Sequence, residues 1–219
     1  NMAENIETVL ELLDKLWTPA LNRAKTEAYD YQNIINDEEE TFKLEPCDWR
    51  YYAEKHRKIK YNINENELKP YFEINNVKKG IFYVCKRLYD IDFVEITDIP
   101  KPHADAVAYE VVNNDGSHVG ILYMDFHPRA SKRSGAWMSS YRKQSGKDEN
   151  FISPVITVNC NFTPPTSSLP SLLTLDEVST FFHEFGHALH GLLSNVEYYS
   201  ISGTSVSRDF VELPSQIME

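Results

Sequence analysis

One predicted helix constrains the fold of this 219-residue chain more than any other segment. Thr174 and Glu177 match a capping box, in which the side chain of each residue bonds the backbone N–H of the other at a helix start. Apolar residues then recur at helical spacing: Val178, Phe181, Phe182, Phe185, Leu189 and Leu192. One face of this helix must therefore pack on a core, which leaves the opposite face free to line a cleft.

The opposite face carries two histidines four residues apart, His183 and His187. Residues at this spacing lie on one side of a helix, with their Cβ atoms roughly 5–6 Å apart. Two imidazoles placed in this way can hold one zinc ion, and Glu184 can reach a water on that metal. Five-residue patterns also arise by chance, but the capped amphipathic helix around this one favours a metal site.

A catalytic zinc site takes three protein ligands and keeps a fourth position for water. A third histidine six residues after the second is excluded, because Leu193 stands there. A carboxylate from a following helix is the common alternative, and the candidates are Glu197, Asp209, Glu212 and Glu219. Glu197 lies too close to the end of the first helix to turn back, whereas spacing does not separate Asp209 from Glu212. His190 is about two turns from His183, so we expect it to support a ligand or to pack.

The rest of the chain changes from helical to strand periodicity near residue 100. Helices are expected over 4–35, 46–60, the stretch from Pro70 to Leu88, and 207–219, with a kink or break at Pro19. Strands are expected over 106–112, 118–126, 135–141 and 154–160, with a hairpin turn at 113–116 and a loop at 163–172. The predicted fold is α+β and mainly helical, with a small, mostly antiparallel sheet beside the helix that carries the histidines.

Composition excludes several kinds of partner. The net charge of −11 argues against nucleic acid, and no apolar run is long enough to span a bilayer. The three cysteines are far apart and form no CxxC pair, so they indicate neither a disulfide framework nor a thiolate zinc site. We expect free thiols, a cytoplasmic location and a monomer.

Both ends of the chain look cut. An amphipathic pattern begins almost at Asn1, and the sequence stops at Glu219 inside a predicted helix without a C-cap. We therefore expect a piece of a longer protein.

Several blocks of the sequence resemble, in order, those of the thimet oligopeptidase family of zinc metallopeptidases, and within it those of the bacterial peptidyl-dipeptidases. The blocks are Trp49-Arg50-Tyr51-Tyr52-Ala53-Glu54-Lys55, Leu68-Lys69-Pro70-Tyr71-Phe72, Gly135-Ala136-Trp137-Met138, the run from His183 to Gly191, Ser202-Gly203-Thr204 and the run from Arg208 to Gln216. Together they extend over nearly the whole chain.

The resemblance implies the third ligand and the organisation of the chain. It makes Glu212 the third ligand of one Zn²⁺ and lets Asp209, one turn earlier, orient a ligand. It implies a helical segment at 1–104 flanking a cleft, and a zincin-like catalytic core at 105–219 that is truncated at its C-terminal end. Members of the family are about three times this length, and a downstream segment bearing tyrosine and histidine contacts their substrates.

The resemblance also implies where substrate binds. The segment Gly135-Ala136-Trp137 is similar to the family's cleft-edge strand, to which the substrate backbone adds as an extra strand. Gly203 and Thr204 are expected to border the same cleft.

The function expected from these features is zinc-dependent hydrolysis of short peptides, with Glu184 as the general base. The peptidyl-dipeptidase resemblance implies release of dipeptides from a free C-terminus, and the isolated chain is expected to be weakly active or inactive. The alternatives are an endo-acting oligopeptidase of the same family and a non-catalytic zincin-like module that binds peptide. A purely structural zinc is disfavoured, because such sites are closed by four Cys or His ligands.

Overall fold

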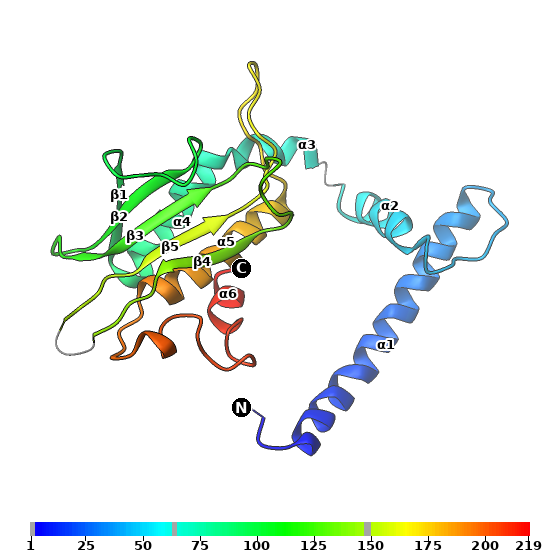
Figure 1. Ribbon diagram of the computed structural model, residues 1–219. Helices are drawn as coiled ribbons and strands as arrows, with labels where there is room; N and C mark the ends of the chain where they lie inside the picture. Colours follow the sequence, from blue (N-terminus) through cyan, green and yellow to red (C-terminus); the bar gives the residue numbers. More distant parts are fainter. Residues whose placement is uncertain (1–2, 63–64, 147–149) are drawn as a thin grey trace. The chain divides into compact units, whose positions relative to one another are not determined.

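The computed structural model describes residues 3–62, 65–146 and 150–219. The chain separates into two compact units, Asn1–Glu65 and Asn66–Glu219 (Figure 1). The second unit contains the sheet and the histidine-bearing helix. This division lies well before the boundary expected after residue 104, because the helix and strand at 74–96 pack within the second unit.

The first unit consists of two helices, α1 (Ile6–Asp37) and α2 (Trp49–Tyr61). The Asn5 side chain accepts a hydrogen bond from the Thr8 N–H at the start of α1. The helix continues through Pro19, so the chain does not break at that residue. The core that joins the two helices consists of Tyr31, Ile34, Ile35 and Tyr52. Helix α2 turns Tyr52 and Ala53 towards this core.

The second unit is built on a five-stranded sheet. Its strands are β1 (Ile91–Ile96), β2 (Val107–Asn113), β3 (His118–Asp125), β4 (Trp137–Arg142) and β5 (Val155–Asn159). Their order is β1-β2-β3-β5-β4, and every neighbouring pair is antiparallel except β3 and β5. The α+β prediction is confirmed, and β4 is an edge strand of the sheet.

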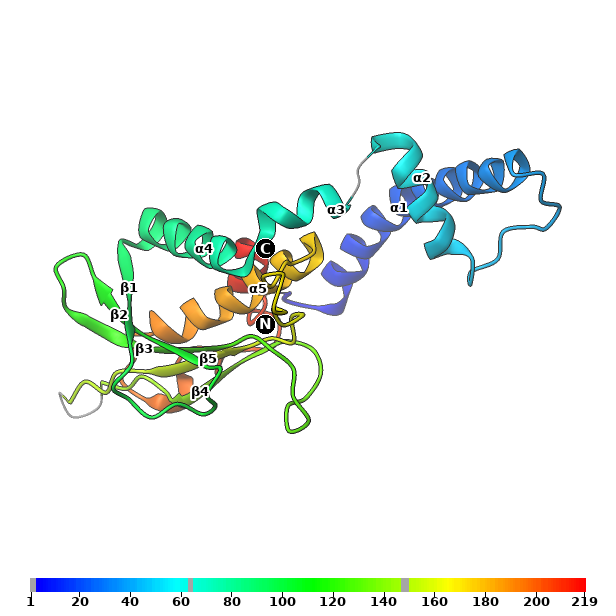
Figure 2. The same cartoon turned by 90° about the horizontal axis from the view of Figure 1, so that it is seen from above.

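The helical segments of this unit are α3 (Glu65–Leu68), a 3₁₀ turn (Lys69–Phe72), α4 (Ile74–Tyr89), α5 (Leu175–Leu192), a second 3₁₀ turn (Tyr199–Ile201) and α6 (Leu213–Met218). Figures 1 and 2 show α4 and α5 on the same face of the sheet. Phe181 and Phe185 on α5 are fully buried in the core that joins these layers. Gly191 allows a close approach, because a Cβ there would lie 2.7 Å from Ile156 Cδ1 on β5.

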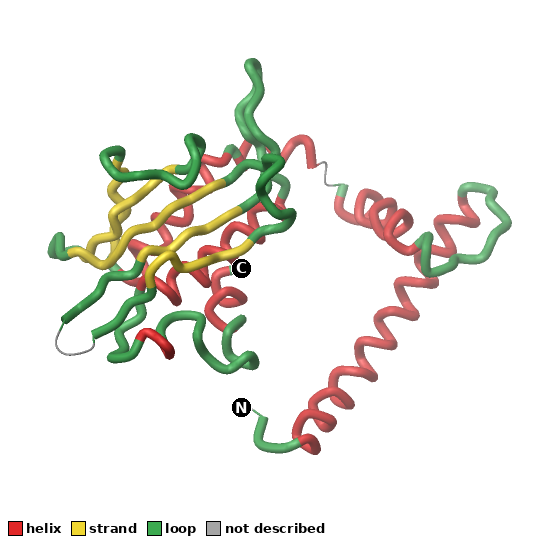
Figure 3. The backbone as a smooth tube through the Cα atoms, in the orientation of Figure 1, coloured by secondary structure: helices red, strands yellow, loops and turns green. Residues whose placement is uncertain are grey.

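Two expectations differ from the observed elements. Strand β1 was not predicted. The helix expected over 207–219 is helical only from Leu213, because residues 208–212 form turns and Pro214 occupies the first turn of α6. Figure 3 shows that the connection from α5 to α6 is mostly loop.

In the described part of the chain, none of the helices is long and apolar enough to cross a bilayer.

Candidate metal centre

Helix α5 begins with the predicted capping box. The Glu177 N–H donates to Thr174 Oγ1 at 3.2 Å, and the Thr174 N–H donates to Glu177 Oε2 at 2.8 Å. These bonds satisfy two donors that a helix start otherwise leaves unpaired. The cap and the buried face fix the rotation of α5, and the rings of His183 and His187 then lie with their centroids 5.0 Å apart.

The carboxylate of Glu212 reaches the two histidines because α6 contacts α5 at Gly186. A Cβ at Gly186 would lie 2.6 Å from the Pro214 carbonyl oxygen and 2.6 Å from Ser215 Cα, which is closer than real Cβ contacts occur. Only glycine therefore permits this approach of the two backbones. Gly186 thus allows Glu212, the residue before α6, to lie beside the two histidines.

The three side chains converge on one point. Glu212 Oε2 lies 3.2 Å from His183 Nε2 and 3.1 Å from His187 Nε2. One ligand atom from each residue lies within 4.8 Å of the other two, so the group could hold a metal ion. In a tetrahedral zinc site with bonds of about 2.0–2.1 Å, neighbouring ligand atoms lie roughly 3.3–3.4 Å apart. The two separations that involve the carboxylate are therefore close to those of such a site, and the chemistry of the three donors suits zinc.

Two further groups hold these ligands in place. Ser215 Oγ donates to Glu212 Oε2 at 2.8 Å. This hydroxyl is the main reason why the pKa of Glu212 lies below its usual value, with the two histidines adding to the effect and burial opposing it. On the far side of His183, Nδ1 lies 3.1 Å from Glu219 Oε2. Carboxylates in this position fix the tautomer and the ring orientation of a metal-bound histidine.

Glu184 lies beside the ligands and is buried, with 8% of its surface exposed. Burial raises the pKa of this carboxyl group and the negative charge of Glu212 acts in the same direction, while His183 and a bond from the Met138 backbone N–H oppose the shift. Met138 belongs to the edge strand β4, so the helix and the strand meet in the cleft. A carboxylate held in this way is suited to accept and return a proton.

A cleft of about 300 Å³ surrounds the three candidate ligands and Glu184. Its other lining residues are Ala136, Trp137, Met138, Thr204 and Val211. Ala136, Trp137 and Thr204 thus line the same cleft as the candidate ligands, and their contact with substrate stays a prediction. Gly135 and Gly203 stand next to them in the chain but do not line this cleft; Gly203 instead packs on the α5 backbone, where its Cβ would lie 3.0 Å from Gly191 Cα.

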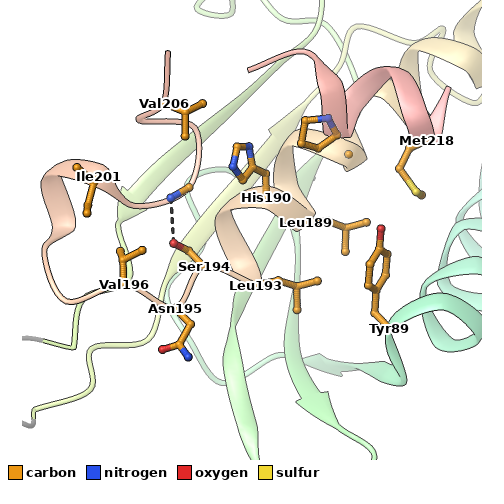
Figure 4. Close-up of a pocket in the computed structure, with 13 residues that line it drawn as sticks. Tyr89, Leu189, His190, Leu193, Ser194, Asn195, Val196, Ile201, Val206 and Met218 are labelled. Atoms are coloured by element: carbon orange, nitrogen blue, oxygen red, sulfur yellow. Dashed lines mark hydrogen bonds between the residues drawn. The ribbon is translucent and has the colours of Figure 1, made fainter. Parts of the chain in front are cut away.

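His190 lies in a different cavity from the candidate metal ligands, and the role expected for Asp209 stays a prediction. His190 lines a second cavity of about 360 Å³, and Figure 4 shows it there with Leu189, Leu193 and Met218. Among the described residues, no hydrogen bond joins His190 to a candidate ligand, and its buried Nδ1 has no partner. Burial lowers the pKa of His190, and His187 adds to this shift. Asp209 lies exposed in the turns before α6.

Sequence reasoning missed the contacts made by Ser215, Met138 and Glu219. Glu219 was weighed only as a ligand, whereas it contacts the outer nitrogen of His183. The spacing of Glu219 from Glu212 is seven residues, or two helical turns, which was the available signal. No pattern in the sequence marks the bond from Met138, because it crosses from strand to helix.

The sequence profile of peptidase family M3 matches residues 1–219. The chain is 42% identical over 219 residues to the dipeptidyl carboxypeptidase of Salmonella typhimurium, and 41% identical to that of Escherichia coli. It is 39% identical over 220 residues to oligopeptidase A of Escherichia coli. Each alignment covers 100% of this chain but 32% of the relative, so the chain spans about a third of the length of these curated relatives. The match over the whole sequence confirms the predicted resemblance, and the chain belongs to peptidase family M3.

Proposed function

We propose that the full-length protein is a zinc-dependent peptidase that hydrolyses short peptides, and that the second unit is its zincin-like core. His183, His187 and Glu212 would hold one Zn²⁺, and Glu184 would act as the general base. The observation that carries this proposal is the convergence of two imidazole nitrogens and one carboxylate oxygen beside a buried glutamate in a single cleft.

The chain's own groups suit this reaction. When bound, zinc would polarise the scissile carbonyl and lower the pKa of a water molecule towards 7. Glu184 would take a proton from that water and pass it to the leaving amine. The Met138 N–H favours the charged form of Glu184 and would support the base in its ionised state. His183 would be held in one orientation by Glu219.

The edge strand supports a place for the substrate. Within the described residues, β4 pairs with β5 alone, so its other edge can accept a peptide as an added strand. Trp137 and Met138 on this strand line the cleft with Glu184. An extended peptide along β4 would therefore carry a backbone carbonyl past the metal ligands.

Dipeptide release from a free C-terminus is the finer part of the proposal. It rests on the similarity to the two dipeptidyl carboxypeptidases. The nearly equal identity to oligopeptidase A favours, as the second candidate, cleavage within short peptides. We place either reaction in the cytoplasm, because Cys85 and Cys160 are free thiols.

Glu184→Gln in the full-length protein tests the catalytic role. Hydrolysis of a short peptide should fall about 10²–10⁴-fold, because the general base is lost, while zinc content stays at one per chain. Asp176→Asn is the matched control, since Asp176 is an exposed carboxylate in the first turn of the same helix. An unchanged rate in the Glu184 variant would remove the base assignment. A wild-type protein that binds peptide without cleaving it would instead support a binding module.

A further inference from the structure

The loop before β4 carries three basic residues, and two of them form ion pairs with one carboxylate inside the protein. Asp125, at the end of β3, pairs with Arg129 at 2.7 Å and with Lys132 at 3.0 Å. The Asp125 and Lys132 side chains are only 3% and 2% exposed. Lys132 Nζ also donates to the His127 carbonyl. This group anchors the loop and holds both side chains against Asp125, so Arg129 and Lys132 are not free to turn towards a substrate, although one positive charge remains in excess.

Arg133, the third basic residue, is exposed and lies against a residue that lines the metal cleft. Its guanidinium lies over the ring of Trp137, with Cζ 5.3 Å from the ring centroid. Its backbone carbonyl accepts a bond from Asn161 Nδ2 at 2.8 Å, and the same amide group binds the Gly135 carbonyl at 2.6 Å. Among the described residues, Arg133 forms no ion pair. The structure thus presents a free cation on an aromatic side chain that itself lines the cleft.

The basic residues at the other end of β4 are engaged with neutral partners. Arg142 donates from Nε to the Ser153 carbonyl at 2.8 Å and from Nη2 to Ser153 Oγ at 3.0 Å. Lys143 donates to Ser205 Oγ at 2.6 Å. The start of β4 is therefore the end at which a guanidinium remains available for an anion.

Strand direction connects this cation to the substrate. Antiparallel pairing is slightly more stable per residue than parallel pairing, so a peptide added to β4 is expected to run antiparallel to it. The C-terminal end of such a peptide lies at the start of β4, next to Trp137 and Arg133. Two residues beyond a scissile bond at the metal centre extend roughly 7 Å, which an arginine side chain can meet.

We propose that Arg133 binds the free C-terminal carboxylate of the substrate and so determines specificity. The inference rests on the proposed peptidase function and deepens it. A guanidinium offers two parallel donors to a carboxylate, and contact with Trp137 restricts its motion before the substrate binds. The net charge of −11 makes a localised cation at the cleft mouth more important, because the rest of the surface repels an anionic peptide end.

The test uses the zinc-loaded full-length protein and one peptide in two forms, with a free C-terminal carboxylate and with a C-terminal amide. Wild type should have a lower KM for the acid than for the amide. Arg133→Gln should raise KM for the acid about 10–100-fold, as expected for loss of a charged hydrogen bond, and leave KM for the amide within about twofold. Arg133→Lys should retain part of the preference, because it keeps the charge but loses the paired donors.

Arg142→Gln is the matched control, since it removes the same charge from the other end of the same strand. The proposal is overturned if Arg133→Gln keeps the wild-type preference, if wild type cleaves both peptides equally well, or if Arg142→Gln is the variant that loses the preference. Failure of wild type to cleave either peptide would count against the peptidase function instead. In that case, calorimetry measures the binding of both peptides to the same variants. Wild type should bind the acid more tightly than the amide, and Arg133→Gln should lose this difference.

Discussion

Helix α5 and the segment from Ser207 to Glu219 supply the two sides of the candidate metal centre in different ways. On α5, a capping box, a buried apolar face and four-residue spacing fix His183 and His187. The other segment has turns at 208–212, and the Glu212 side chain is 52% exposed. Its carboxylate is positioned by the contact of α6 with Gly186 and by the bond from Ser215. The helical ligands are thus specified locally, and the carboxylate ligand is specified by tertiary packing.

Loss of a ligand on the α5 side should have the largest effect. His187→Ala removes one of three donors from the site, so the full-length protein should purify without stoichiometric zinc and lose measurable hydrolysis. Metal analysis and a peptide assay measure this. His118→Ala is the control, because His118 is a partly exposed histidine that pairs with Glu110 outside the cleft. Stoichiometric zinc in the His187 variant would contradict the ligand assignment.

The packing between the two sides can be changed without touching a ligand. Gly186→Ala should push α6 away from α5, because its Cβ would meet Pro214 and Ser215 at 2.6 Å. We expect zinc affinity to fall about 10–100-fold and the unfolding free energy to fall by about 1–3 kcal/mol. Competition with a chelator and urea denaturation measure the two effects.

Gly80→Ala is the control for this substitution. Gly80 lies within α4, and a Cβ there would meet no atom within 4 Å. This variant should keep its zinc affinity and become more stable by about 0.5–1 kcal/mol, because alanine is the better helix former. If Gly186→Ala also kept full zinc affinity, Glu212 would not depend on the close packing of α6.

A smaller effect is expected at the outer nitrogen of His183. Glu219→Gln keeps a hydrogen-bond acceptor but removes the charge that polarises the imidazole, so zinc affinity should fall about tenfold. The same chelator competition measures it, with Glu197→Gln as control. Equal affinities in the two variants would show that the contact of Glu219 has no effect on the metal.

The smallest effect on the site should come from the start of α5. Thr174→Ala removes the acceptor for the Glu177 N–H and should reduce the unfolding free energy by about 0.5–2 kcal/mol. Zinc affinity should not change, because the apolar face still fixes the rotation of α5. A loss of affinity as large as that of the Gly186 variant would remove the distinction between the two sides.

The sequence predicted elements with a strong local signal. The capping box at Thr174 and the hairpin turn before His118 are where they were expected. Strand β1 was missed although the end of the preceding helix was not: the helix expected to Leu88 ends at Tyr89, and Asp90 takes a left-handed conformation (φ 56°). Only Ile91 of the six β1 residues is buried, so the strand carries little of the inward-facing apolar pattern by which strands are predicted.

The candidate site also contains residues that the sequence predicted and a contact that it did not. Spacing placed Glu184 between two histidines, and the family resemblance selected Glu212 from the possible carboxylates. Neither one predicted that Gly186 allows α6 to approach, because the contact joins residues 28 or more positions apart and depends on an absent side chain. The helix expected from Ser207 begins only at Leu213, and residues 208–212 form turns with local backbone bonds such as that from the Phe210 N–H to the Ser207 carbonyl.

Within the described residues one edge of β4 is unpaired, which has a consequence for the behaviour of the protein in solution. A strand edge that accepts one peptide backbone can also accept the edge of another protein chain, which is how sheet proteins begin to aggregate. Ser139, Ser140 and Arg142 on this strand make the edge polar and end it with a charge, which disfavours such pairing. Replacing these residues with apolar ones would therefore reduce solubility before it altered the metal centre.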